Sequence, residues 1–550
     1  MADSSTTQGP QAGRPLSRGG DFEHPLVFWL GVLACTAGVL LHLPMYVQAR
    51  HMGYMMVGMR PDAPMLTGMA LIVAGLLAVF YGIVPRRSGE IARTASHLKV
   101  TSLDDAPIRR QHVVLLLLMS LAVTIDVMKP ASLGFIAPGA AKEYGLKSPA
   151  NPAGHIPVSW LPLTGIVGTV IGSWLWGALG DRIGRRASIV LSGMLFVTTS
   201  ICGTMPGFKW NLLMCLLMGI GAGGMLPVAF TLIAEIMPAR HRGWLLVLVG
   251  GNAAVAYAAT SWLSGELMPT YSWRIMWLIG LPTGLLLILL NRWIPESPRH
   301  LLAVGRAEEA ETVLARYGAV LRHTGEEPAA PVAEGPRGGY LGLFRPPFGG
   351  ISAAITVLGL GIGLVTYGFQ LWIPTNLQHL GYSSVNSDYV VRNAALIGLP
   401  LTVVGAWLYA RFGSRRTMVA MCVVTAVVLG VIAAAGDSLA HHELLLSLLL
   451  VVPLSGISSV VAVVSGYASE VYPTAVRSRG SGLAAGMTKL GGVLILAVIV
   501  SAGTVPSITE TALIGAAPLL VAAVALLRTG PETKRRQLEE ISREVAEAAG

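Results

Sequence analysis

The sequence predicts an all-α polytopic membrane protein with fourteen transmembrane spans. Of its 550 residues, 53% are hydrophobic and only 12% are charged, whereas soluble globular chains carry about 25% charged residues. The apolar residues form long runs, and roughly 20 such residues suffice for a helix to cross a bilayer. Lysine and arginine gather in both termini and in every second loop, which is typical of a chain threaded repeatedly through a membrane.

The predicted spans are separated by short loops, except at two places where a longer polar segment intervenes. The apolar runs lie at 26–48, 64–85, 112–138, 158–180, 187–205, 210–234, 244–265, 273–294, 350–375, 389–410, 417–435, 443–467, 481–503 and 509–527. We therefore expect a disordered tail (1–25), an N-terminal helix pair (26–85), a basic linker (86–111), a six-helix bundle (112–294), a second linker (295–349), another six-helix bundle (350–528) and a tail (529–550).

The net charge of +10 reports orientation in a membrane rather than binding of nucleic acid. Because basic residues mark the cytoplasmic side, both termini and the two long linkers are expected in the cytoplasm. The plasma (inner) membrane is the expected location, and anionic lipid headgroups are the expected partners of the basic loops.

The chain shows no pattern typical of an enzyme. Its four cysteines, Cys35, Cys202, Cys215 and Cys422, all fall within predicted spans and are expected to be core residues. GIGAGG at 219–224 resembles a dinucleotide fingerprint, but no strand precedes it, so close helix packing explains it better. We expect no cofactor, no metal site and no catalytic residue.

The two six-span blocks repeat each other. WGALGDRIGRRAS (176–188) and YARFGSRRTM (409–418) each follow the second span of a block. AEIMPARHRG (234–243) and SEVYPTAVRSRG (469–480) each end a fourth span, with Glu, Pro and Arg at the same spacing. Both copies lie on the cytoplasmic side, so the halves are related by an axis along the membrane normal.

These motifs resemble the major facilitator superfamily, over residues 112–545. The segment GALGDRIGRR fits the family's loop signature closely, and PESPRHLLAVGRAEEAETVL (295–314) with PETKRRQLEEI (531–541) is similar to the sugar-porter and metabolite–proton symporter branch. Residues 125–146 resemble the first core helix of aromatic acid–proton symporters and nicotinate transporters. Asp126 matches their first aspartate, while Lys129 stands where their second would be. The fifth core helix lacks the drug–proton antiporter signature, which argues against drug export.

Asp126 and Lys129 interrupt the apolar run at 112–138. Three residues apart, they share one side of a helix and can pair there, and Pro130 cannot donate a hydrogen bond to the carbonyl of Asp126. Ionisable residues within spans are functional by default. We expect Asp126 to carry the coupling proton and Lys129 to attract a carboxylate substrate; the alternative is a structural ion pair.

Other polar residues within spans are candidates for the lining of a central cavity. Lys489 is expected to line the path or to neutralise Asp126 across the halves, unless it reaches the cytoplasmic interface instead. Arg392 is expected to draw anions from the outside. Packing or interface roles are the alternatives for these residues. The further substrate-binding candidates are Asn252, Tyr257, Tyr367, Gln370 and Trp372.

The resemblance implies a cytoplasmic latch that bridges the halves while the carrier faces outward. A solvated basic loop would explain the arginines but not Asp181, which stands between Gly180 and Gly184. The second copy has Ala410 in place of that aspartate, so its half of the latch is expected to be weaker. The residues of the expected gate are Asp181, Arg182, Arg185, Arg186, Glu235, Arg242, Glu470 and Arg477.

The expected function is proton-coupled symport of a small organic anion by alternating access between the halves. The partners are then a small-molecule substrate, protons and membrane lipids, and the sequence leaves the oligomeric state open. The alternatives are an exporter, a carrier of sugars, neutral solutes or drugs, and a transporter-like sensor. The basic linker at 86–111 is too short to hold a signalling domain, which disfavours the sensor.

Overall fold

The computed structural model of the chain describes residues 24–83, 98–99, 103, 106–148, 151–303, 305–319, 322–323, 339–346, 348–472, 477–502, 506–529 and 532. This described part is helical except for one antiparallel pair of two-residue strands, β1 (Leu98–Lys99) and β2 (Arg322–His323). The tails expected at 1–25 and 529–550 and the linker expected at 86–111 fall largely outside it.

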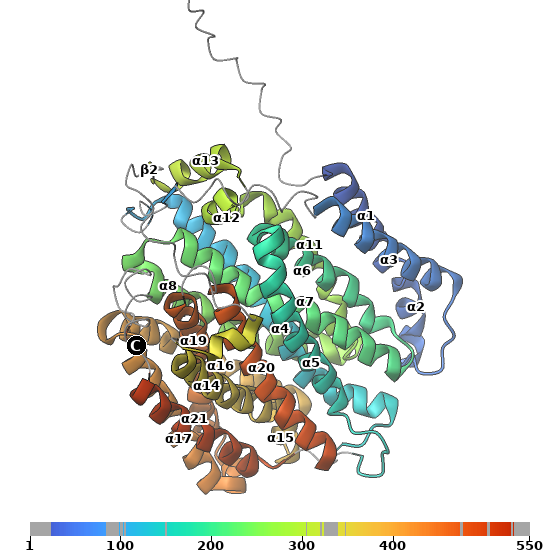
Figure 1. Cartoon of the computed structure of the whole chain (residues 1–550). Helices are drawn as coiled ribbons and strands as arrows, with labels where there is room; N and C mark the ends of the chain where they lie inside the picture. Colours follow the sequence, from blue (N-terminus) through green and yellow to red (C-terminus); the bar gives the residue numbers. More distant parts are fainter. Residues whose placement is uncertain are drawn as a thin grey trace, which may run out of the picture.

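The N-terminal helices form a pair on one flank of the molecule (Figure 1). They are α1 (Pro25–Leu40), α2 (Leu43–Gln48) with the 3₁₀ turn η1 (Ala49–Met52), and α3 (Ala63–Ile83). Helices α1 and α3 pack on each other and on α6 (Arg185–Thr199). Cys35 and Val79 share one buried apolar cluster with Val190 and Met194 of α6, so the pair is docked on the bundle.

Two further sets of helices make up the body of the molecule. The first half contains α4 (Arg110–Tyr144), α5 (Trp160–Ile183), α6, η4 (Ser200–Thr204), α7 (Phe208–Ile236), α8 (Ala239–Gly250), α9 (Asn252–Tyr271), α10 (Ile275–Leu278), α11 (Gly280–Leu290) and η5 (Asn291–Trp293). The second half contains η6 (Gly339–Phe344), α14 (Gly349–Gly368), η7 (Gln370–Trp372), α15 (Ile373–His379), α16 (Ser384–Phe412), α17 (Ser414–Ala435), η8 (Gly436–His441), α18 (Glu443–Val451), η9 (Val452–Gly456), α19 (Ile457–Val471), α20 (Arg477–Ala502) and α21 (Ile508–Thr529).

The halves meet mainly along four pairs of helices, α5 with α20, α9 with α16, α8 with α19, and α8 with α16. Between the halves in sequence lie α12 (Pro298–Ala303) and α13 (Ala307–Tyr317), at one end of the bundle, whereas α2 and α15 lie toward the other (Figure 1). We call these the α13 end and the α15 end.

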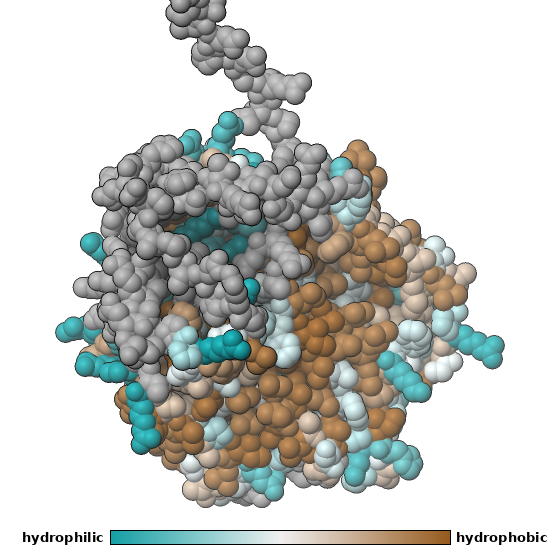
Figure 2. All heavy atoms as spheres, viewed as in Figure 1, coloured by the Kyte–Doolittle hydropathy of each residue, from teal (hydrophilic) through white to brown (hydrophobic). Residues whose placement is uncertain are grey.

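Among the described residues, thirteen helices are long and apolar enough to cross a membrane. Helix α5, which corresponds to the expected span at 158–180, is not one of the thirteen although it has 24 residues. Apolar side chains cover most of the central part of the face in Figure 2, as lipid contact requires. The chain is a multi-pass membrane protein.

Candidate functional site

A buried carboxylate lies on α4 where it faces the second half. Asp126 is 5% exposed, and its Oδ1 atom is enclosed without a hydrogen-bond partner among the described residues. The charge of Lys489 on α20 acts on it from a distance, since no ion pair joins the two among the described residues. Pro130 lies within α4 and leaves the Asp126 carbonyl without its helical donor. Asp126 is thus an acid whose electrostatic partner belongs to the other half.

Lys489 connects the two halves directly. Its Nζ donates a hydrogen bond of 2.7 Å to Ser173 Oγ of α5 and one of 2.8 Å to the Gly223 carbonyl of α7. Ser173 itself donates to the same Gly223 carbonyl. These two hydrogen bonds from one ammonium hold α20 against the first half.

Lys129 faces a different space from Asp126. No ion pair joins the two among the described residues, so the expected pairing on α4 is not found. The Lys129 ammonium lies 5.9 Å from the ring centre of Phe196 and borders a cavity of only about 10 Å³ shared with Thr260 and Thr283. These neighbours belong to α6, α9 and α11, so Lys129 is enclosed by the first half.

Two tyrosines complete the central group. Tyr257 of α9 is buried, and Tyr367 of α14 lies close enough to both Tyr257 and Asp126 for a charge on one to affect the others. The structure therefore brings together four of the residues singled out in the sequence, Asp126, Lys489, Tyr257 and Tyr367. They come from four helices and from both halves.

The other candidates for cavity lining lie elsewhere. Gln370 donates 2.6 and 3.1 Å hydrogen bonds to the carbonyls of Pro453 and Leu454 in its own half. Trp372 is 1% exposed within an apolar cluster. The Arg392 guanidinium bonds to Asn393 and stacks 4.3 Å from the centre of the Tyr389 ring. Asn252 is the first residue of α9 and is half-buried.

At the α13 end, the expected gate residues of the first half contact one another. Arg185 pairs with Glu235 at 3.1 Å and also donates to the Gly180 carbonyl. Arg242 is buried and donates to the Met237 carbonyl. The Arg185–Glu235 pair therefore joins α6 to α7 within one half rather than one half to the other.

In the second half, Glu470 accepts a 3.0 Å hydrogen bond from the Tyr409 hydroxyl. Tyr409 also closely approaches Gly243 of α8, so this tyrosine connects the gate of one half with the other. The side chains of Asp181, Arg182 and Arg477 lie outside the described residues, and the part of the latch expected from them stays a prediction.

Glu296, which sequence reasoning did not assign to the gate, caps α6. Its carboxylate accepts from the backbone amides of Arg185 at 2.8 Å, Arg186 at 3.2 Å and Ser297 at 2.9 Å. A carboxylate at a helix N-terminus satisfies free N–H groups and favours the helix dipole. Burial raises the pKa of Glu296, although these amides and the Arg185 charge oppose the rise.

The second half repeats this cap. Glu532 accepts from the Ser414 amide at 2.6 Å and from its hydroxyl at 2.8 Å, at the start of α17. Gly184 and Gly413 precede the capped residues with φ of +96° and +95°, a backbone region that glycine adopts without strain. The matching Pro-Glu-Ser and Pro-Glu-Thr sequences at 295–297 and 531–533 were the signal that could have predicted both caps.

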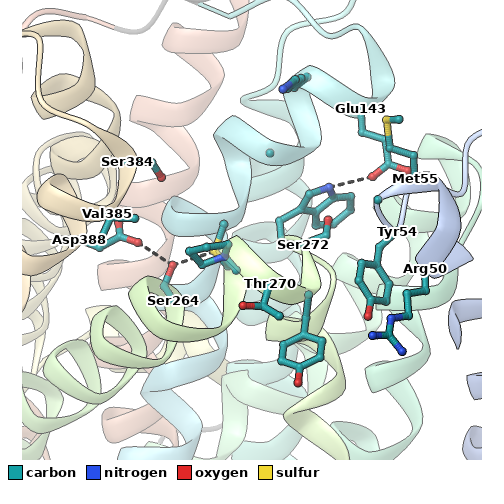
Figure 3. Close-up of a pocket in the computed structure, with 17 residues that line it drawn as sticks. Arg50, Tyr54, Met55, Glu143, Ser264, Thr270, Ser272, Ser384, Val385 and Asp388 are labelled. Carbon is teal, nitrogen blue, oxygen red and sulfur yellow. Dashed lines mark hydrogen bonds between the residues drawn. The ribbon is translucent and has the colours of Figure 1, made fainter.

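A cavity of about 900 Å³ opens at the α15 end, and Figure 3 shows its lining. Its walls come from the segment after α2, from α4 and α9, and from α16. Asp388 of α16 accepts a 2.8 Å hydrogen bond from Ser264 of α9, and Glu143 pairs with the fully buried Arg274 at 2.7 Å. Sequence reasoning missed all four residues because each acts through a partner distant in the chain.

Comparison with known proteins settles the family. Residues 114–496, well over half of the chain, match the model of the Major Facilitator Superfamily. The chain belongs to the Major Facilitator Superfamily. The family predicted from the loop motifs is therefore confirmed, and so is the all-helical fold. This major facilitator is a secondary transporter of small metabolites and not an enzyme.

Similar members of the superfamily carry small metabolites according to their names. The chain is 26% identical over 452 residues to the niacin transporter NiaP of Acinetobacter baylyi, covering 80% of this chain and 99% of that protein. It is 27% identical over 427 residues to the 4-hydroxybenzoate transporter PcaK of the same organism, covering 74% and 88%. Its fold is similar to that of the proton:xylose symporter XylE from E. coli, with a TM-score of 0.63, 19% identity and coverage of 79% and 98%.

Proposed function

We propose that this major facilitator couples the uptake of a small organic carboxylate to the entry of protons. The observation that carries the proposal is the buried Asp126 carboxylate, whose charged partner Lys489 is hydrogen-bonded across the halves to Ser173 and Gly223. The similarity to transporters of niacin and of 4-hydroxybenzoate supports an aromatic acid as cargo.

The cycle follows from the exchange of partners at Lys489. A proton on Asp126 cancels the charge that attracts Lys489, so the ammonium is free to bind the carboxylate of the cargo. Tyr257 and Tyr367 offer hydroxyl groups and aromatic faces to the same ligand. In this proposal Lys489 takes the role expected of Lys129, which the first half encloses. When the Lys489 ammonium leaves Ser173 and Gly223, α20 is released from the first half. The two halves then rock about the central group of residues.

The proposal includes an orientation. The α13 end is cytoplasmic, as the positive-inside rule predicts, and the protein lies in a plasma (inner) membrane with both termini inside. Helix α5 then counts as a fourteenth span beside the thirteen, and α1 with α3 forms the additional pair. The glutamate-capped arginine loops act as the cytoplasmic latch.

Uptake into proteoliposomes tests this function. Radiolabelled nicotinate, 4-hydroxybenzoate and xylose are offered with and without an inward proton gradient, to the wild type and to Asp126→Asn. We expect accumulation of a carboxylate in the wild type, and exchange without gradient-driven accumulation in the variant. Asp62→Asn, at the α15 end, serves as the matched control. Undiminished accumulation by Asp126→Asn overturns the assignment of the proton site, and ligand binding without transport indicates a sensor.

A further inference from the structure

The segment between α2 and α3 is held firmly against the α15 end of the first half. The amide of Met56, a fully buried residue, donates a 2.7 Å hydrogen bond to Glu143. The Tyr46 hydroxyl donates a 2.6 Å hydrogen bond to the Tyr271 carbonyl. Tyr54 stacks on Tyr46 with ring centres 4.8 Å apart. This segment is therefore a built part of the surface and not a free loop.

The Tyr54 backbone has φ of +62°, which is unfavourable for a bulky residue and persists only where the surroundings hold it. The strained turn presents Arg50, Tyr54 and Met55 to the cavity of about 900 Å³ (Figure 3). Across that space lie Lys142 of the first half and Asp388 of the second.

The solvent-exposed charge in this cavity is positive. Glu143 is neutralised by Arg274, and Asp388 is 4% exposed with its carboxylate bonded to Ser264. Arg50 and Lys142 are both exposed, and neither forms an ion pair among the described residues. A concave site lined by unpaired cations concentrates anions.

We infer that residues 50–55 form one wall of an outer vestibule, in which Arg50 and Lys142 collect the organic anion before it reaches the central site. The segment that precedes the family fold thus contributes to cargo capture. The identity of the cargo rests on the proposed function, whereas the positive vestibule does not.

Cysteine modification tests the vestibule without any substrate. The four native cysteines are buried, so Met55→Cys and Met52→Cys offer the reactive thiols; Met52 is 46% exposed but does not line the cavity. The probes are two membrane-impermeant methanethiosulfonates, one anionic (sulfonatoethyl) and one cationic (trimethylammonioethyl). We expect the anionic reagent to be favoured at least threefold more at residue 55 than at residue 52.

Adding Arg50→Ala should reduce that preference, because only Lys142 then remains, whereas Arg60→Ala, an exposed arginine of the same loop, should preserve it. An equal preference at residues 55 and 52, or an equal effect of the two arginine variants, overturns the inference. So does protection of residue 55 from reagents added outside.

Uptake supplies the second arm of the test. Arg50→Ala should raise the concentration of nicotinate or 4-hydroxybenzoate for half-maximal uptake by about threefold at unchanged maximal rate, and Arg60→Ala should not. If the wild type carries neither acid, the proposed function fails while the charge preference at residue 55 still decides the vestibule. If the acids are carried and Arg50→Ala behaves like Arg60→Ala, the vestibule fails alone.

Discussion

The Asp126 carboxylate and the Lys489 ammonium belong to different halves, so the protonation of one changes what holds the halves together. Burial of either charge alone would be costly. In the proposed cycle, the interaction of the two charges across the interface offsets that cost in one state of the carrier and not in another. Lys129, enclosed in the first half, has no comparable partner among the described residues.

Uptake should therefore respond differently to neutralisation of the half-buried Lys489 and of the buried Lys129. Lys489→Met removes two charge-assisted hydrogen bonds, each worth about 1.5–3 kcal/mol, and should lower carboxylate uptake by at least about tenfold. Lys129→Met replaces an enclosed cation with an apolar side chain of similar length and should keep uptake within about twofold. Initial uptake rates and melting temperatures check both variants, and a tenfold loss in Lys129→Met with a small loss in Lys489→Met would contradict the assignment.

His300, which lies beside the α5–α6 turn, should make the loops at the α13 end sensitive to acid. Burial lowers the pKa of His300 to about 4, with Arg185 and Arg306 acting in the same direction and Glu235 opposing them. Between the ordinary histidine pKa of about 6.5 and pH 4, His300 binds a proton in the unfolded chain but not in the folded chain. Its contribution to the free energy of unfolding is therefore complete above about pH 6.5 and is lost as the pH falls toward 4.

The expected loss is about 3 kcal/mol at most. Melting temperatures of the purified protein between pH 7 and 4 should fall more steeply for the wild type than for His300→Gln. His155→Gln, at an exposed histidine, should follow the wild type. Parallel curves for all three proteins would exclude this role of His300.

At the scale of elements, the two glutamate caps fix the loops that carry the proposed latch. Glu296 and Glu532 each accept a hydrogen bond from the first amide of a helix that begins directly after a glycine with positive φ. Each cap links the segment that ends a half to the turn between the second and third core helices of that half. The proposed latch would thus be anchored by segments that the loop motif does not include.

Removing a cap should loosen that helix start. Glu296→Ala removes the carboxylate that accepts from three backbone amides and should cost about 3 kcal/mol of local stability, and Glu532→Ala, which removes the acceptor of one amide and one hydroxyl, should loosen α17 to a smaller extent. Hydrogen–deuterium exchange should rise at 185–188 in the first variant and at 414–417 in the second. Glu308→Ala, on the exposed side of α13, is the control; unchanged exchange in either cap variant would contradict this account.

At the scale of the whole molecule, the N-terminal pair acts as a unit docked on α6. Helices α1 and α3 approach so closely that a methyl group at Gly38 would lie 2.6 Å from the Gly68 carbonyl oxygen. Small residues allow membrane helices to pack in this way. The pair then places the α2–α3 segment at the mouth of the cavity.

Separating the pair should therefore impair transport from a distance. Gly38→Leu should force α1 from α3, move the segment away from Glu143 and lower uptake about threefold, with the rest of the fold intact. Val73→Leu, on the exposed surface of α3, adds bulk without this clash. Normal uptake by a stable Gly38→Leu protein would indicate that the pair is a passive attachment.

The amino-acid sequence by itself determined the membrane class, the repeated halves and the family, because span length, charge distribution and loop motifs are local properties of a chain. It also singled out Asp126, Lys489, Tyr257 and Tyr367. Only the tertiary structure decided which cation meets Asp126. Residues 126 and 129 are separated by about 300° around a helix, so their side chains point some 60° apart, and the neighbouring helices determine which space each one enters. For the same reason, the sequence did not predict the contacts of Glu143 with Arg274 and of Asp388 with Ser264. The residues of each pair lie more than one hundred positions apart in the chain and become neighbours only through helix packing.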